Sequence, residues 1–82
     1  MALERLKNAQ QKCVGVKEAM KAVSEERAQE VYIALDADRD VVKPLEETCQ
    51  DKQVEVIYVD EMKELGEAAG IRVNATSACI LK

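Results

Sequence analysis

Residues 30–40, Glu-Val-Tyr-Ile-Ala-Leu-Asp-Ala-Asp-Arg-Asp, place an apolar segment directly before a loop rich in carboxylates. The segment Glu30–Leu35 is β-branched and mostly apolar, which predicts a buried strand. Asp36–Asp40 carries side chains that cap helices, and residues 41–49 after it have an apolar helical face. A buried strand that leads through a short loop into a helix is the unit from which α/β sheets are built.

The flanking sequence continues this alternation in both directions. Hydrophobic spacing predicts these further elements, in chain order: a helix over 2–11, a strand at Cys13–Val14, a helix over Val16–Ser24, a strand over Val54–Val59, a helix capped by Asp60 and ended by Gly70, and a strand over Ser77–Leu81. Pro44 is expected within or just before the first turn of its helix, because deeper it would remove a hydrogen bond. The order predicts a central sheet of four strands, partly parallel, with helices on both faces.

Length and composition restrict the class of protein. A chain of 82 residues forms one domain, residues 1–82, with one small core. Hydrophobic residues make up 48% and charged residues 34%, which is typical of a globular protein. Histidine is absent, which excludes Ser-His and Cys-His nucleophile pairs. The apolar runs are far shorter than the ~20 residues of a membrane helix, so we expect a soluble, cytoplasmic protein. Because the residues for a reaction are missing, we expect no enzyme, and we expect a monomer.

The cysteines support a reducing compartment. Cys13, Cys49 and Cys79 lie about thirty residues apart and form no Cys-x-x-Cys pair. This pattern argues against a disulfide framework or a zinc site. We expect three small apolar thiols in a reduced core, with no metal and no cofactor.

Charge is distributed unevenly along the chain. The net charge is −4, yet residues 1–22 carry five Lys or Arg against two Glu, and the other sixty residues carry seven against fourteen acidic residues. This asymmetry predicts a small basic face on an acidic body. A nucleic acid would have to be bound there by specific contacts as well as by the electrostatic attraction of the basic face.

The segment Gly15-Val-Lys-Glu-Ala-Met-Lys21 offers the chemistry for such contacts. Glycine before a helix lets a ligand approach the backbone, and the free N–H groups of the helix start favour a phosphate. Lys17 and Lys21 share one helical face, with Glu18 beside them. Lysine donates to O6 or N7 of guanine, while a carboxylate accepts from its amino and imino groups. The alternative is a solvated helix face with one intrahelical ion pair.

Two loops carry further polar or exposed groups. Asp36 and Asp38 follow a buried strand at its carboxyl end, where α/β sheets place ligands. They could form a paired-carboxylate site, or only solvate the loop and cap the next helix. The segment Ile71-Arg72-Val73 places apolar groups beside a cation in a second loop, and its alternative is the edge of the core.

Four segments, taken in order, resemble a known family: Gly15-Val16-Lys17-Glu18-Ala19-Met20-Lys21, Ile33-Ala-Leu-Asp-Ala-Asp38, Leu65-Gly66-Glu-Ala-Ala-Gly70 and the closing strand of small residues. The chain resembles the kink-turn-binding ribosomal protein family typified by the archaeal large-subunit protein L-seven-Ae, and especially its small bacterial members. The resemblance covers nearly the whole chain. It implies a three-layer α/β/α sandwich with a four-stranded mixed sheet.

The resemblance also implies a partner, which is structured RNA in a ribosome or another ribonucleoprotein. Members of the family bind the kink-turn, a duplex bent at a three-nucleotide bulge that is followed by tandem sheared G·A pairs. By position, the resemblance assigns RNA contacts to these residues: Gly15 and Val16 through the backbone, Lys17, Glu18 and Lys21 to the guanines, Asp38 beside a flipped base, and Ile71, Arg72 and Val73 as a loop cover.

Two positions depart from the family's archaeal pattern. Lys17 stands where that pattern has asparagine, which concerns the fine sequence preference, and bacterial members tend to share the change. Arg39 stands where the loop usually continues to proline, which concerns only how the next helix begins. Two other readings stay open: a protein-interaction module of the same fold, and a small enzyme that uses Asp36, Asp38 or a cysteine, although no activating base is present.

Overall fold

The computed structural model describes the backbone of residues 2–82 and the side chains of residues 3–82. Its elements, in chain order, are α1 (Ala2–Asn8), β1 (Lys12–Val14), α2 (Val16–Ser24), β2 (Ala28–Ala34), α3 (Arg39–Lys52), β3 (Glu55–Val59), α4 (Met62–Ala69) and β4 (Ser77–Leu81). The strands form one sheet in the order β1-β4-β2-β3. β2 runs parallel to β3, whereas β4 is antiparallel to both β1 and β2.

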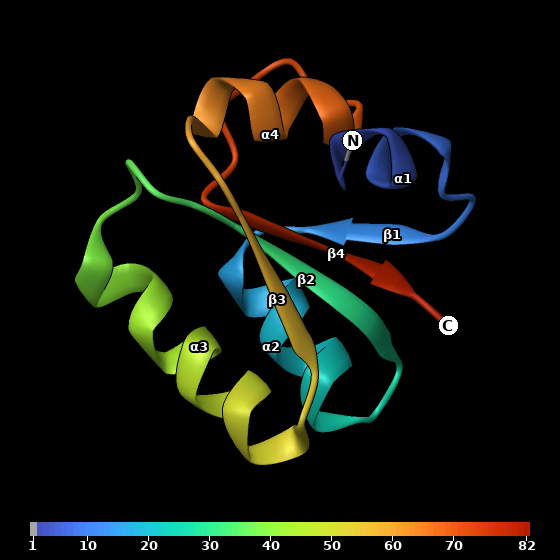
Figure 1. Ribbon diagram of the computed structural model, residues 1–82, viewed down its shortest axis with the longest axis vertical. Coiled ribbons are helices and arrows are strands. Elements are labelled where there is room, and N and C mark those ends of the chain that lie inside the picture. Colours follow the sequence, from blue (N-terminus) through green and yellow to red (C-terminus); the bar gives the residue numbers. More distant parts are fainter. Residues whose placement is uncertain (1) are drawn as a thin grey trace.

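The helices cover the sheet on both faces. Figure 1 shows α2 and α3 packed together on one side of the sheet and α1 and α4 on the other. β2 lies between β4 and β3, and its residues Val31–Ala34 are fully buried. Burial on both faces explains why residues 31–34 form a continuous apolar run instead of alternating with polar residues. The predicted three-layer α/β/α sandwich with a four-stranded mixed sheet is confirmed.

α1 is shorter than the predicted helix over 2–11, because it ends at Asn8. Lys12 lies at the start of β1, and its Nζ donates to the carbonyls of Leu6 at 3.2 Å and Lys7 at 3.3 Å. These bonds satisfy carbonyl groups that the end of a helix leaves without an intrahelical partner. The helix therefore ends at Asn8, and β1 begins at Lys12, before the predicted third helical turn can form.

The expectation for Pro44 is wrong. α3 begins at Arg39, so Pro44 lies in its second turn. Asp38 is the cap, and its side chain accepts a hydrogen bond from the Asp40 N–H at 2.9 Å. The hydrogen bond that Pro44 cannot make is the one to the Asp40 carbonyl, so the missing bond lies close to the N-terminus of the helix.

The predicted cap of α4 by Asp60 is also wrong. The cap residue is Glu61, and its side chain makes no capping hydrogen bond. The first N–H of the helix, that of Met62, instead donates to Oδ1 of Asp36 at 2.8 Å. The predicted end is correct, since Gly70 closes α4 in the left-handed conformation with φ +85°.

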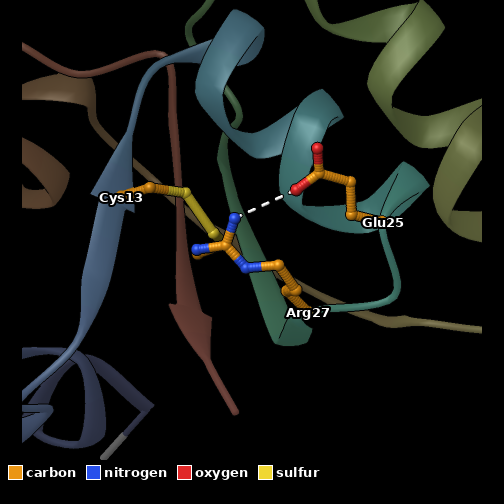
Figure 2. Close-up of a disulfide and its surroundings, with 4 residues drawn as sticks. Cys13, Glu25 and Arg27 are labelled. Carbon is orange, nitrogen blue, oxygen red and sulfur yellow. Dashed lines mark hydrogen bonds and ion pairs between the residues drawn. A yellow bond between two sulfur atoms is a disulfide. The ribbon is translucent and has the colours of Figure 1, made fainter.

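Cys13 and Cys79 form a disulfide, so the expectation of three reduced thiols is wrong for these two (Figure 2). The two residues face each other across β1 and β4, with a Cα–Cα distance of 5.3 Å. Spacing along the chain could not reveal this, because the pairing of the first strand with the last is a tertiary event. Cys49 is the free buried thiol, and burial raises its pKa to about 11. Within residues 2–82, no helix is long and apolar enough to cross a membrane.

Candidate nucleic-acid interface

Three segments that are distant in sequence meet at one end of the sheet: the start of α2, the loop after β2, and the loop between α4 and β4. The Gly15 N–H donates to the Ser77 carbonyl at 2.8 Å, which joins the start of α2 to β4. The Ala34 N–H donates to the Thr76 carbonyl at 3.0 Å, which joins the end of β2 to the late loop. The structure therefore brings together all three segments that the sequence nominated.

Asp36 is a bridging residue that the sequence analysis missed in this role. Its carboxylate holds the Met62 N–H, and the Met62 carbonyl accepts from the Ala75 N–H at 3.1 Å. The loop after β2, the start of α4 and the late loop are thus linked through two bonds. No pattern in the sequence shows that Asp36 caps a helix 26 residues further along the chain.

The start of α2 presents free backbone donors. Gly15 has φ +96° and ψ 156°, a conformation that strongly favours glycine. Gly15 has no side chain to cap the first turn, and a Cβ built there would meet no atom within 4 Å. The start of the helix thus has no side-chain cap, and the space beside Gly15 is open, which suits an anion.

Lys17, Glu18 and Lys21 are all exposed on α2. Neither lysine forms an ion pair with a residue that the structure describes, so the alternative of an intrahelical pair does not hold. Glu18 and Lys21 also line a hollow of about 340 Å³ together with Arg27. This face of α2 therefore presents two lysine donors and, between them in sequence, the carboxylate acceptor of Glu18.

Two other cations in the basic half of the chain, Arg5 and Lys12, are engaged internally. Arg5 Nε lies 3.3 Å from a carboxylate oxygen of Glu30, which is buried. The Tyr32 hydroxyl donates to the same carboxylate at 3.0 Å. Burial, and then this hydrogen bond to Glu30, raise the pKa of Tyr32 to about 12. Since Lys12 also caps α1, the free basic surface is narrower than the composition suggested.

The late loop separates into a buried part and an exposed part. Ile71 is partly buried and packs against the core, which agrees with the alternative of a core edge for that residue. Arg72 and Val73 are exposed, and Val73 is 70% exposed. Gly66 of α4 lies under the loop, where a Cβ would overlap the Val73 carbonyl oxygen. A glycine inside a helical pattern is the sequence signal that could have revealed this close approach.

The side chain of Asp38 is used in capping α3, as its structural alternative predicted. Beside it, Arg39 Nη2 donates to Glu46 at 2.6 Å, and the Tyr58 hydroxyl donates to the other oxygen of Glu46 at 2.5 Å. The Arg39 and Tyr58 hydrogen bonds lower the pKa of Glu46, and Glu46 raises the pKa of Tyr58. Arg39, which departs from the family's proline, thus fastens the first turn of α3 to its third.

Comparison with known proteins places this arrangement in a family. The sequence model described as the ribosomal protein L7Ae/L30e/S12e/Gadd45 family matches residues 1–82. An RNA-binding protein of Halalkalibacterium halodurans is 40% identical over 82 residues, the full length of both chains. An RNA-binding protein of Caldanaerobacter subterraneus is 46% identical over 65 residues, which is 79% of each chain.

Solved structures agree with the sequence comparison. The Giardia lamblia 15.5 kD RNA binding protein superimposes with a TM-score of 0.93 at 33% identity, over 99% of this chain and 71% of that one. A protein of unknown function from Bacillus halodurans superimposes with a TM-score of 0.84 at 25% identity, over 98% of this chain and 80% of that one.

The fold and the matched sequences define a non-enzymatic binding protein, so the prediction that the chain is not an enzyme is confirmed. The chain belongs to the ribosomal protein L7Ae/L30e/S12e/Gadd45 family, and the resemblance drawn from its sequence is confirmed.

Proposed function

We propose that the protein binds structured RNA and recognises the kink-turn, whose bent form it stabilises. The observation that carries the proposal is the convergence of the α2 start, the loop after β2 and the late loop at one end of the sheet. Distorted RNA exposes base edges that a regular A-form helix hides, so a small protein can read them. The names of the relatives, RNA-binding proteins, support the same class of partner.

Each segment has a task in this proposal. Gly15 and Val16 offer the open backbone at the helix start to a phosphate or a sugar, as their conformation allows. Lys17, Glu18 and Lys21 read the guanines of the sheared pairs, because they supply donors and an acceptor on one exposed face.

The loops complete the surface. Arg72 and Val73 cover the unpaired bulge nucleotides, with Ile71 anchoring their loop in the core. Asp38 borders the pocket for a flipped base from the cap of α3. Ribonucleoprotein or ribosomal association and a cytoplasmic, monomeric state follow from this proposal as expectations.

The decisive experiment concerns the sign of one substitution. If binding were only counterion release, Glu18→Ala would strengthen it, because a negative charge near the phosphates would be removed. If Glu18 accepts hydrogen bonds from a guanine, Glu18→Ala leaves a donor unpaired and costs about 1–3 kcal/mol. Affinity for one kink-turn is measured by gel shift at two salt concentrations, with circular dichroism to confirm the fold.

The controls are a straight duplex and a distant carboxylate. The kink-turn should bind at least ~10³-fold more tightly than a fully paired duplex of equal length. Glu47→Ala removes an exposed charge of α3 and reports the effect of net charge alone. Tighter binding by Glu18→Ala would leave a basic patch but refute the reading of bases, and equal affinity for both RNAs would refute recognition of the kink-turn.

A further inference from the structure

The disulfide between Cys13 and Cys79 connects the first strand of the chain to the last. The two cysteines are 66 residues apart in sequence and directly opposite each other in the antiparallel pair of β1 and β4. β1 is an edge strand of three residues, and among the described residues 2–82 it pairs with β4 alone. A strand this short has few backbone bonds to hold it, so a covalent link to β4 matters more here than it would in a long strand.

The link lies immediately before the proposed RNA-contact segment. Val14, which pairs with Ala78, separates Cys13 from Gly15, and the Gly15 N–H is bonded to the Ser77 carbonyl. Any movement of β1 away from β4 would therefore carry the start of α2 with it. The disulfide fixes the origin of the helix that bears Lys17, Glu18 and Lys21.

The two cysteines differ in how far they are exposed. Cys13 is partly exposed and lines the hollow of about 340 Å³ that Glu18, Lys21 and Arg27 also line, whereas Cys79 is fully buried. In Figure 2 the guanidinium of Arg27 lies next to the disulfide, and its Nη1 donates to Oε1 of Glu25 at 3.0 Å. Cys49 is buried on α3 and does not belong to this site.

We propose that Cys13 and Cys79 form a reversible thiol–disulfide site that sets the affinity of the α2 end for RNA. The proposal rests on the proposed function. In oxidation, the Cys13 thiolate attacks a low-molecular-weight disulfide of the glutathione class and releases one thiol. The Cys79 thiolate then attacks the Cys13 sulfur and releases the second thiol. Two protein thiols are oxidised to one disulfide, and one external disulfide is reduced to two thiols. A dithiol reverses the exchange.

The oxidised form binds RNA more tightly. With the link closed, the start of α2 is already held in the arrangement that contacts RNA, and binding does not have to order β1. With the link open, that ordering reduces the affinity, and an effect of about three- to tenfold corresponds to one or two immobilised residues. By linkage, bound RNA favours the closed disulfide by the same factor.

The test measures the affinity of Cys49→Ser protein for a kink-turn and for a straight duplex, after treatment with glutathione disulfide or with dithiothreitol. Thiol titration establishes the state of the pair, and circular dichroism establishes that both states are folded at the assay temperature. A variant without thiols, Cys13→Ser/Cys49→Ser/Cys79→Ser, receives the same treatments. The expected result is at least about threefold tighter kink-turn binding by the oxidised protein, with no response in the thiol-free variant.

The outcomes separate the two proposals. A preference for the kink-turn that is equal in both verified states overturns the redox site and leaves the proposed function intact. No preference for the kink-turn in either state overturns the proposed function. Loss of the whole fold on reduction, or a thiol-free variant that responds to the reagents, also overturns the site, because the effect would then not arise from a local change at β1.

Discussion

Substitution of Gly66 by alanine tests the contact that positions the late loop. Gly66 lies within α4, and a Cβ built on it comes closer than 3.0 Å to the Val73 carbonyl oxygen. The same Cβ lies 3.2 Å from the Val73 carbonyl carbon and 3.4 Å from the Ala75 nitrogen. The obstacle is backbone and not a flexible side chain, so the loop has to move.

Two effects of opposite sign decide the result. Alanine in place of glycine inside a helix stabilises a protein by about 1 kcal/mol through helix propensity. Forcing a methyl group into a packed contact costs about 1–3 kcal/mol, and a backbone obstacle favours the upper part of that range. Gly66→Ala should therefore destabilise the fold by about 1–2 kcal/mol, which lowers the midpoint of thermal unfolding by about 5–12 °C in a domain of this size.

Thermal and urea unfolding followed by circular dichroism measure this change, with Glu67→Ala as the matched control. Glu67 is exposed on the same helix, so its replacement changes helix propensity without touching the loop. Kink-turn affinity should fall about tenfold in Gly66→Ala and stay close to wild type in the control. A Gly66→Ala protein that is more stable than wild type by about 1 kcal/mol would show that propensity dominates and that the loop does not rest on this glycine.

Two further substitutions test the loop and the buried cluster. Val73→Asp should leave the midpoint of thermal unfolding nearly unchanged, because Val73 is 70% exposed, but it should weaken kink-turn binding about tenfold. Val73→Thr, the control, keeps the shape of the side chain and most of the affinity. If Val73→Asp unfolds the protein, this side chain belongs to the core. The pKa of Tyr32 is raised from 10.0 to about 12, so its contribution to stability is complete below pH 10 and is lost as the pH rises towards 12. That loss is on the order of 2–3 kcal/mol. Tyr32→Phe has no group to titrate at this position, so its stability to urea should decline less between pH 10 and 12 than that of the wild type. Equal declines would contradict the raised pKa.

Local patterns predicted most of the architecture. The bounds of α2 and β4 agree with the prediction, and Gly70 ends α4 as expected, because helical spacing and a left-handed terminator are properties of a few adjacent residues. The order of elements then favoured an open sheet of four strands, partly parallel, because helical crossovers join parallel neighbours, and the family resemblance implied that the sheet is mixed. The fold class could be predicted because hydrophobic spacing, helix caps and the order of the elements all favoured the same architecture.

What the sequence could not show depends on the pairing of distant segments. The Cys13–Cys79 disulfide exists because β1 and β4 are neighbours, and the capping of α4 by Asp36 exists because two loops meet at the end of the sheet. Ile71 and Val73 have similar side chains two positions apart, yet one packs against the core and the other points to solvent. Hydrophobicity in a loop does not distinguish these cases, since the difference is set by what lies beneath the backbone.

The number of free cations near the interface predicts how steeply RNA binding depends on salt. Arg5 is paired with Glu30 and Lys12 caps α1, so the cations left to the three segments are Lys17, Lys21 and Arg72. Even if each of these three cations also neutralises a phosphate near the base that it contacts, the slope of log affinity against log salt is only about −2 to −3. Between 50 and 200 mM salt, kink-turn affinity should then fall only about 20- to 40-fold, where a protein with a broad basic surface loses 10³-fold or more.

Lys21→Ala should reduce that slope by about 1 if Lys21 neutralises a phosphate as well as contacting a guanine, and should leave the slope unchanged if Lys21 contacts the guanine alone. Lys52→Ala is the matched control, because Lys52 ends α3, at the opposite end of that helix from the interface, and lies 4.0 Å from Glu26. Gel shifts of both variants across a salt series give the slopes directly. A wild-type slope steeper than about −5 would mean that additional lysines meet the RNA, and the interface would then have to extend beyond the end of the sheet onto α1. A shallow slope together with tight binding would instead require that hydrogen bonds and apolar contacts supply most of the affinity, which is how a chain of net charge −4 can hold a polyanion.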